Sequence, residues 1–370
     1  MHKHYLVTAA NGGLTVKSVG LDALPDSAWT PVIGADEGGG ALDLYERIPW
    51  LYRAVNLRAD AIASLPTSWE ALDGTPLAAP PRLPFALDLP HLLNLIEGWL
   101  TLYGAAYVFK GMNAARRVKQ LRPLHPRTVS PIYEGERGLV GYERQAGGER
   151  VALGLEEVVA IWLPARRAEL GYGVPPAQAA LSAAGMLSAA DQFGEQYFQH
   201  GAVMPTLISI EGMPSPGDME KLESWAGRAM SGLRNAFRPL ALRAPVKVQP
   251  LAGNVELGKL ALPELTDKKR EDIATALGVP HSLLFSNAAN YATARQDDLH
   301  FYDKTVLPEA RRIEAALNSG LFERQGVRLR FRPDRLEIYQ SLEAQKADRV
   351  VALVTTEVIT RDEARQLLGL

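Results

Sequence analysis

The pattern of apolar and polar positions predicts a mainly helical chain with one run of short strands. Apolar residues recur at helical spacing from 48 to 65 and again, more densely, from 89 to 103. Between residues 118 and 162 the pattern changes to four short strand-like segments, TVSPIYE, LVGYERQ, RVALG and EVVAIWL, separated by turn-forming glycines. These segments predict a small antiparallel sheet or meander, so the expected fold class is α+β, mainly helical.

The first helix shows its stripe most clearly. Its expected core positions are Leu51, Val55, Ala59, Ile62 and Leu65, and Pro66 ends it. Arg53, Arg58 and Asp60 fall off that stripe, and we expect them on the surface. Near the middle of the chain, the sequence predicts a helix from Pro176 to about His200 that is unusually rich in alanine. Alanine favours close helix packing and is also the best helix former, and both interpretations stay open.

Residues 263–318 predict a short charged helix, a stop, a polar loop and a long amphipathic helix. Gly278 is the expected left-handed cap of the first helix, and Pro280 prevents its continuation. The second helix contains Pro308, which removes one backbone hydrogen bond, so we expect a kink there. Further on, Thr360 and Glu363 form a predicted capping box for a terminal helix.

Several of these segments together resemble the portal proteins of tailed bacteriophages, of the siphophage type. IATALGVPHSLLF resembles the lead-in to the family's tunnel loop, and FYDKTVLPEARRIEAALN resembles the long helix that follows. AVNLRADAIASLP is similar to the wing helix, YFQHGAVMPTLISIEG to the passage from stem to clip, and EVITRDEARQLLGL to the crown. The resemblance spans roughly residues 45 to 370, and the ordered set of segments makes it specific.

The resemblance implies a portal fold with wing, stem, clip and crown regions that assembles as a ring. The expected regions, in order, are a flexible N-terminal arm at 1–44, a wing of helices and antiparallel sheet at 45–175, a first stem helix at 176–201, a clip at 202–262, a second stem helix at 263–278, a tunnel loop at 279–295, a long kinked helix and wing strand at 296–339, and a short crown at 340–370.

The resemblance also implies function and partners. A portal forms a twelvefold ring at one capsid vertex, through which double-stranded DNA enters during packaging and leaves on ejection. The implied partners are copies of the chain itself, double-stranded DNA bound without sequence specificity, the large terminase, the major capsid protein and a head-tail adaptor. The implied location is the portal vertex of the virion, with assembly in the host cytoplasm.

Candidate residues follow for each region. In the tunnel loop the candidates for contact with DNA are Asn287, Asn290, Tyr291 and Thr293. Their neutral side chains can hydrogen-bond phosphate without the salt-dependent electrostatic attraction that a lysine adds. In the clip the candidates for docking terminase or adaptor are Glu220, Glu223 and Arg228.

The strand VRLRFRP places three arginines on one face. They are candidates for a subunit interface, and the alternative is a solvated edge strand protected by its charges. The three are Arg328, Arg330 and Arg332.

The composition and net charge fit a channel through which DNA slides better than they fit a protein that binds DNA tightly. The formal net charge is −2 and the sequence pI is about 6.4, whereas proteins that bind DNA by neutralising phosphates are usually basic. The chain has no cysteine, which excludes disulfides and thiol chemistry. No run approaches the roughly 20 apolar residues of a membrane span, so we expect a soluble cytosolic product without a membrane partner.

Sequence motifs of catalysis are absent. There is no phosphate-binding loop, nucleophile elbow, zinc-protease motif or dinucleotide fingerprint in the 370 residues. His125 lies between prolines and is expected to be structural. We therefore expect no catalytic residue, no cofactor, no metal and no enzymatic activity. An unrecognised enzyme and a non-portal multimeric adaptor or scaffold protein of the virion remain as alternatives.

Overall fold

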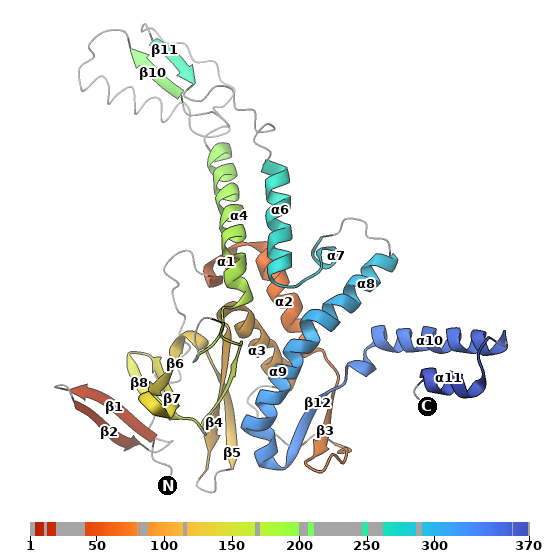
Figure 1. The fold of residues 1–370 in the computed structure, drawn as a ribbon. Coiled ribbons are helices and arrows are strands. Elements are labelled where there is room, and N and C mark those ends of the chain that lie inside the picture. The colour runs from red at the N-terminus through yellow and green to blue at the C-terminus, as the bar shows by residue number, and fades with distance from the viewer. Residues whose placement is uncertain are drawn as a thin grey trace.

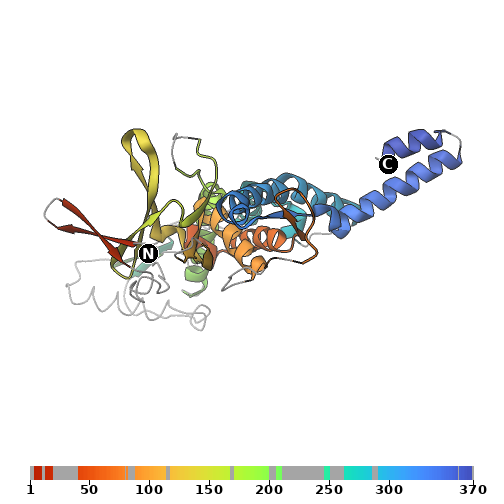
Figure 2. The same cartoon turned by 90° about the horizontal axis from the view of Figure 1, so that it is seen from below.

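The computed structural model describes residues 4–10, 13–19, 41–79, 81, 88–113, 117–166, 171–199, 206–210, 246–250, 262–285, 291–356 and 358–368. A central body carries two projecting pairs of helices, α4 with α6 and α10 with α11 (Figure 1). The β1–β2 hairpin and the α10–α11 pair lie at opposite ends of the molecule (Figure 2).

The N-terminal part of the body contains three helices: α1 (Ala41–Arg47), α2 (Pro49–Ala63) and α3 (Leu89–Tyr103). The predicted stripe of α2 is confirmed, because all five of its apolar positions are buried. The expectation that Arg58 lies on the surface is wrong: the residue is 6% exposed, since its guanidinium is neutralised by a buried carboxylate of α3.

Two antiparallel sheets cover the body. One has the strand order β5–β4–β9, and the other has the order β2–β1–β8–β7–β6. Their strands and short helical turns are β1 (His4–Ala10), β2 (Gly13–Val19), β4 (Ala105–Met112), β5 (Val118–Leu124), η3 (Pro126–Thr128), β6 (Val129–Glu134), η4 (Gly135–Arg137), β7 (Gly138–Ala146), β8 (Glu149–Gly154) and β9 (Val158–Trp162).

Two expectations about these sheets need correction. The predicted meander exists as β6–β7–β8, but the fourth segment, β9, pairs with β4 in the other sheet. β9 is buried along most of its length, and an apolar run of this kind is drawn to the core instead of the half-exposed meander. The expected flexible arm at 1–44 contains the β1–β2 hairpin, whose β1 pairs with β8, and the first residues of α1.

The long helix is interrupted twice by wider turns. It runs through α8 (Tyr291–Phe301), a π-helical turn η6 (Tyr302–Val306), α9 (Leu307–Leu317) and a second π turn η7 (Asn318–Phe322). In η6 the Leu307 N–H donates to the Tyr302 carbonyl, five residues back, directly before Pro308. The expected break in helical geometry at Pro308 therefore takes the form of a π turn on its N-terminal side.

The chain then returns to the body as a strand. After η8 (Glu323–Gln325), β12 (Val327–Phe331) pairs antiparallel with β3 (Thr67–Ala71). The predicted alternation is present, with Leu329 fully buried and Arg330 exposed.

The elements that project from the body are two pairs of helices. The first pair is α4 (Pro176–Gln199) with α6 (Leu262–Ala276), and β10 (Thr206–Ile210) pairs with β11 (Val246–Pro250) between them in sequence. The second pair follows η9 (Pro333–Arg335) and consists of α10 (Glu337–Thr355) and α11 (Arg361–Leu368). The capping box is confirmed, because the Thr360 N–H donates to Glu363 at 2.8 Å and the Glu363 N–H donates to Thr360 Oγ1 at 3.3 Å.

Candidate nucleic-acid interface

The candidate interface begins where α6 ends. Gly278 adopts a left-handed conformation with φ of +64°, as predicted for the cap. The Val279 N–H donates to Ala274 O at 2.9 Å and the Gly278 N–H donates to Thr275 O at 3.1 Å. These two bonds form a complete Schellman motif, which ends the helix sharply and turns the chain toward α7 (His281–Leu284).

Two side chains from other helices bind the next carbonyls. Arg58 Nη1 of α2 donates to Leu277 O at 2.7 Å, and Thr305 Oγ1 of the η6 turn donates to Gly278 O at 2.6 Å. A Cβ on Gly278 would lie 2.8 Å from Thr305 Oγ1, so glycine is needed here for close approach as well as for its dihedral angle. The end of α6 is therefore attached to both α2 and the long helix.

Arg58 is itself fixed by a buried ion pair. Its Nε and Nη2 both lie 2.9 Å from Glu97 Oε1, and Thr101 Oγ1 donates to the same oxygen at 3.1 Å. Glu97 is fully buried, and its Oε2 has no hydrogen-bond partner among the residues described. Burial raises the pKa of Glu97 above its usual value, Arg58 opposes this rise, and the charge of Glu309 adds to it.

Aromatic rings hold the chain just beyond α7. The Phe285 ring stacks on Trp50 with centroids 4.5 Å apart and on His281 with centroids 4.0 Å apart, at an interplanar angle of 24° in each case. The Arg270 guanidinium carbon lies 4.9 Å from the centroid of the Trp50 ring. Phe285 is the last described residue before α8, so this stack fixes the chain at the start of residues 286–290.

The predicted loop is shorter than expected. Asn287 and Asn290 lie outside the described residues, whereas Tyr291 and Thr293 belong to the first turn of α8. The range 279–295 thus contains α7 and the start of a helix. Its helix-forming alanines, Arg295 and Gln296 support that helix, but the segment lacks the apolar stripe on which sequence recognition depends.

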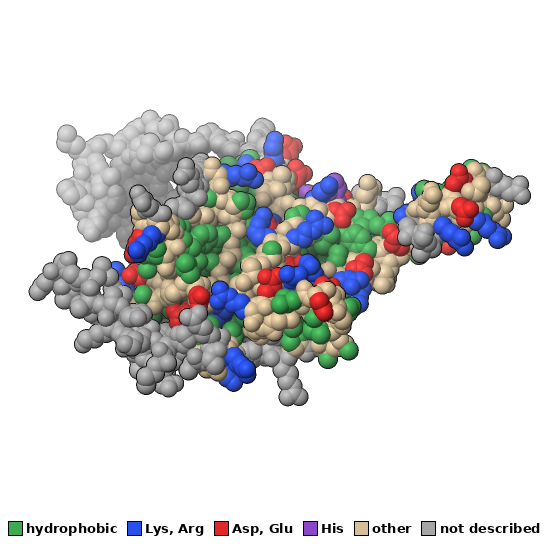
Figure 3. All heavy atoms as spheres, turned by 60° about the horizontal axis from the view of Figure 1, so that its bottom comes forward, with side chains coloured by type: hydrophobic (Ala, Val, Ile, Leu, Met, Phe, Trp, Pro, Cys, Tyr) green, Lys and Arg blue, Asp and Glu red, His purple; other side chains and the backbone are tan. Residues whose placement is uncertain are grey.

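Charges beside this segment are paired within α6. Lys269 Nζ lies 2.8 Å from Asp272 Oδ2, and Arg270 Nη1 lies 2.8 Å from Asp267 Oδ1. The face of the body shown in Figure 3 carries basic and acidic side chains interspersed with hydrophobic ones. Such a surface has little long-range attraction for phosphate.

The clip candidates fall outside the described residues. Glu220, Glu223 and Arg228 all lie in 211–245. The two strands at the borders of this region, β10 and β11, pair antiparallel, with Thr206 opposite Pro250 and Ile210 opposite Val246.

The three arginines of β12 and its end are each bonded to an acid of their own chain. Arg328 Nε donates to Glu323 Oε1 at 2.8 Å, and Arg332 makes two bonds to Asp334 at 2.9 and 3.0 Å. Arg330 reaches two acids, with Nη1 2.9 Å from Glu314 Oε1 and Nε 3.3 Å from Glu70 Oε2. Their role at a subunit interface stays a prediction, and any such contact would compete with these bonds.

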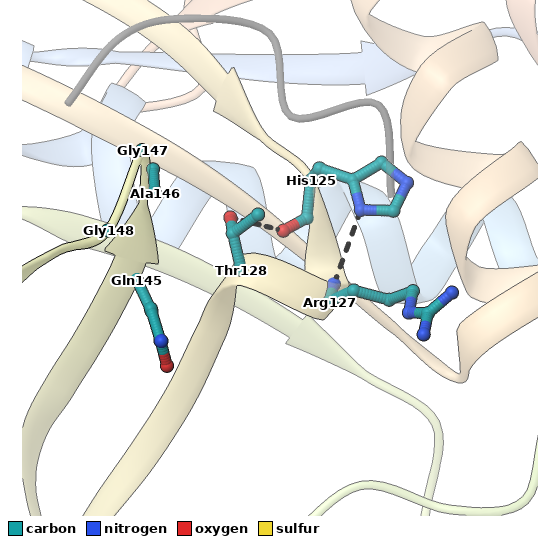
Figure 4. A pocket seen from close by; sticks show the side chains of 7 residues that line it. All are labelled: His125, Arg127, Thr128, Gln145, Ala146, Gly147 and Gly148. Atoms are coloured by element: carbon teal, nitrogen blue, oxygen red, sulfur yellow. Dashed lines mark hydrogen bonds between the residues drawn. The ribbon is translucent and has the colours of Figure 1, made fainter. Parts of the chain in front are cut away.

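A pocket of about 320 Å³ surrounds His125, the histidine that the sequence marked as structural. Its lining residues are His125, Arg127, Thr128, Gln145, Ala146, Gly147 and Gly148 (Figure 4). His125 Nδ1 accepts a hydrogen bond of 3.4 Å from the Arg127 N–H, and its ring meets Trp99 and Tyr103 edge-on. Burial and the nearby Arg127 hold the pKa of His125 below its usual value, which favours the neutral ring. The His125 side chain thus caps η3, and Gln145 points away from the ring (Figure 4).

The described residues contain neither a metal-binding cluster nor a membrane span. No three His, Asp or Glu side chains among them are grouped so that they could hold a metal ion. None of the helices in the described part of the chain is both long enough and apolar enough to cross a membrane.

Sequence reasoning missed the residues that support the interface. Arg58, Thr305 and Trp50 act on a segment more than 25 residues away, and no local pattern reveals such contacts. One signal was present, because Arg58 follows Val55 by three residues and so lies close to the apolar stripe of α2.

The fold is shared with known portal proteins. The structure is similar to a chain in the neck of the empty gene transfer agent particle computed with C6 symmetry, with a TM-score of 0.62, 23% identity and coverage of 89% of this chain and 93% of that one. It is similar to a chain in the native particle's neck computed with C12 symmetry, with a TM-score of 0.61, 24% identity and the same coverage. A crystal structure of an HK97 family phage portal protein from Corynebacterium diphtheriae matches with a TM-score of 0.53 and 18% identity, over 80% of this chain and 95% of that one. The architecture is thus a portal fold.

Sequence comparison establishes the family. The family model for the phage portal protein matches residues 49–369. A probable portal protein of Streptomyces phage phiC31 is 25% identical over 348 residues, which cover 85% of this chain and 74% of that protein. This chain belongs to the phage portal protein family.

Proposed function

We propose that this chain is the subunit of a ring at one capsid vertex, through which double-stranded DNA is packaged and ejected. The observation that carries the proposal is the family match over 49–369, which includes both projecting helix pairs and the segment between α6 and α8. The similar chains belong to necks of gene transfer agent particles computed with C6 and C12 symmetry, which supports a ring. The proposed number of copies is twelve. The subunit acts without catalytic turnover, as a conduit assembled in the host cytoplasm and retained in the virion.

The decisive experiment is the native mass of the purified chain. Twelve copies of a 40.3 kDa chain give a particle of about 480 kDa with a central hole. A stable monomer at micromolar concentration would contradict the ring. A thirteen-membered particle would change the copy number only.

Residues 286–290 with the start of α8 are proposed to face the DNA. The charge pairs within α6 and the uncharged loop sequence support low affinity for phosphate, which sliding requires. Replacing Asn287 and Asn290 together by lysine should leave ring assembly intact and slow DNA translocation, more at low salt than at high salt. Wild-type packaging rates across a salt series would show that this segment does not line the path.

Residues 202–262 are proposed to dock the large terminase and, later, the head-tail adaptor, while the body contacts the major capsid protein. The support is their position, since β10 and β11 lie beyond the far ends of α4 and α6, away from the body (Figure 1). Glu220→Lys or Glu223→Lys should block packaging while rings still form. Unchanged packaging in both variants would remove the docking proposal and leave the ring proposal standing.

A further inference from the structure

The start of the candidate loop is anchored by side chains that belong to neither α6 nor α8. The Schellman motif at Gly278 uses only backbone groups of residues 274–279, at the end of α6 and just beyond it. Two of the carbonyls outside this motif, Leu277 O and Gly278 O, are bonded by Arg58 of α2 and by Thr305 of the η6 turn. The last carbonyls of a helix usually accept hydrogen bonds from water or from groups nearby in the chain.

The third anchor is aromatic and comes from α2 as well. Trp50 lies in the first turn of α2 and stacks on Phe285, the residue that precedes 286–290. Stacked aromatic pairs add to the energy of the area they bury and restrict the angle between the rings. The chain is therefore held on both sides of α7: before it by the carbonyls of Leu277 and Gly278, and after it by the ring of Phe285.

These anchors lead into the main core of the molecule. Arg58 is fixed by the buried carboxylate of Glu97 on α3, and Thr305 is followed by Val306, which is 1% exposed in that core. Movement at residues 277–285 would consequently have to break contacts with α2 and with the η6 turn, and not only with α6 and α8, which flank the loop.

We propose that Thr305, Arg58 and Trp50 are positioning residues, which fix the first residues of the loop to the body so that load on the loop passes into α2 and the long helix. The proposal rests on the proposed function, because load arises only if DNA moves past this segment. It differs from that function in naming residues that do not contact DNA.

Thr305 gives the cleanest test, because its hydroxyl can be removed without changing the shape of the side chain. Thr305→Val removes the donor to Gly278 O, and Thr305→Ser restores it. The matched control is Thr355→Val, since Thr355 Oγ1 donates to Val351 O at 2.8 Å within α10, far from the loop. All three variants are studied as assembled rings beside the wild type.

The first measurement is amide hydrogen exchange. The loss of one hydrogen bond should speed exchange in 277–285 by about 2- to 10-fold in Thr305→Val, with the melting temperature of the ring nearly unchanged. Thr305→Ser should return exchange to the wild-type rate, and Thr355→Val should not affect this segment. Unchanged exchange in Thr305→Val would overturn the positioning role.

The second measurement is DNA packaging by the same rings. Thr305→Val should slow packaging several-fold, and Thr305→Ser should restore the rate. Faster exchange combined with wild-type packaging would overturn the claim that the anchor carries load. If wild-type rings do not translocate DNA, the proposed function fails and the claim about load falls with it, while the exchange data still decide whether Thr305 anchors the segment.

Discussion

Asn318 pairs with Leu329 as a neighbouring strand would. Its Nδ2 donates to Leu329 O at 2.9 Å, and its Oδ1 accepts from the Leu329 N–H at 2.8 Å. Two residues further along the same edge, the Phe331 N–H donates to Glu314 Oε2 at 2.8 Å. Side chains of the long helix thus close the edge of β12 that faces away from β3, which protects it from pairing with another chain.

Replacing Asn318 by alanine should destabilise the body by about 2–4 kcal/mol, because both backbone groups of Leu329 lose their partners in a buried site. Chemical unfolding of the variant measures the loss. Asn94→Ala is the matched control, since Asn94 donates to Asp60 at an exposed position and its removal should cost less than about 1 kcal/mol. Equal losses in the two variants would contradict the bridging role of Asn318.

The buried ion pair predicts strong coupling between Arg58 and Glu97. Arg58→Met leaves a buried carboxylate without its cation and should cost about 3–5 kcal/mol. The double variant with Glu97→Met should recover most of that stability, since burial of two apolar side chains replaces burial of two charges. A double-mutant cycle by chemical unfolding measures the coupling. Additive losses would show that the two charges do not depend on each other.

The second π turn packs so closely on β9 that Gly320 cannot carry a side chain without movement. A Cβ there would lie 2.9 and 3.0 Å from the two methyl carbons of Val159. Gly320→Ala should therefore cost about 1–3 kcal/mol, and the loss should shrink when Val159→Ala makes room.

Gly98→Ala provides the control for that prediction. Gly98 lies in α3, and nothing lies within 4 Å of the position that an alanine methyl group would take there. Alanine should therefore be neutral or should stabilise the helix by about 0.5–1 kcal/mol. Thermal unfolding compares the variants. Equal effects at the two glycines would show that the contact with Val159 is not the cause.

Lys110 should make stability depend on pH in the alkaline range. Its Nζ donates to Gly320 O at 2.6 Å, and burial, followed by the charge of Arg324, lowers the pKa of Lys110 to about 8 from 10.5. Between these values the unfolded chain binds more protons than the folded one, so the unfolding free energy should rise with pH. The contribution is lost as pH falls through about 8.

The measurement is the unfolding free energy of the wild type and of Lys110→Met between pH 8 and 10.5. The difference between the two should change across this window in the predicted direction. Lys119→Met, at an exposed position of β5, should keep the wild-type slope. A constant difference for Lys110→Met would contradict the lowered pKa.

The elements that the sequence predicted well are those defined by local chemistry. Gly278 was recognised as a cap because only a glycine readily adopts its dihedral angles, and Thr360 with Glu363 because their spacing is a capping box. The charged pairs of α6 are equally local, because each joins two residues three positions apart on one helix.

The misplaced elements depend on partners far away in the chain. Arg58 was expected on the surface because its carboxylate partner lies 39 residues away. The strand β9 joins β4 instead of its sequence neighbour β8, and Tyr291 begins a helix whose first residues show no apolar stripe in the sequence. For the candidate interface, the sequence predicts the segment, whereas the side chains that hold its start are visible in the structure alone.

Several contacts join residues that are more than 200 positions apart in the sequence, and this affects how the chain folds while it is being translated. Arg58 bonds Leu277 across 219 positions, Lys110 bonds Gly320 across 210, and Arg330 reaches Glu70 across 260. A domain with such non-local contacts folds slowly, because long loops must close before the contacts form. During translation, the edge of β3 that pairs with β12 stays open until β12 has left the ribosome. A truncated chain ending before residue 327 would therefore expose this strand edge and tend to aggregate.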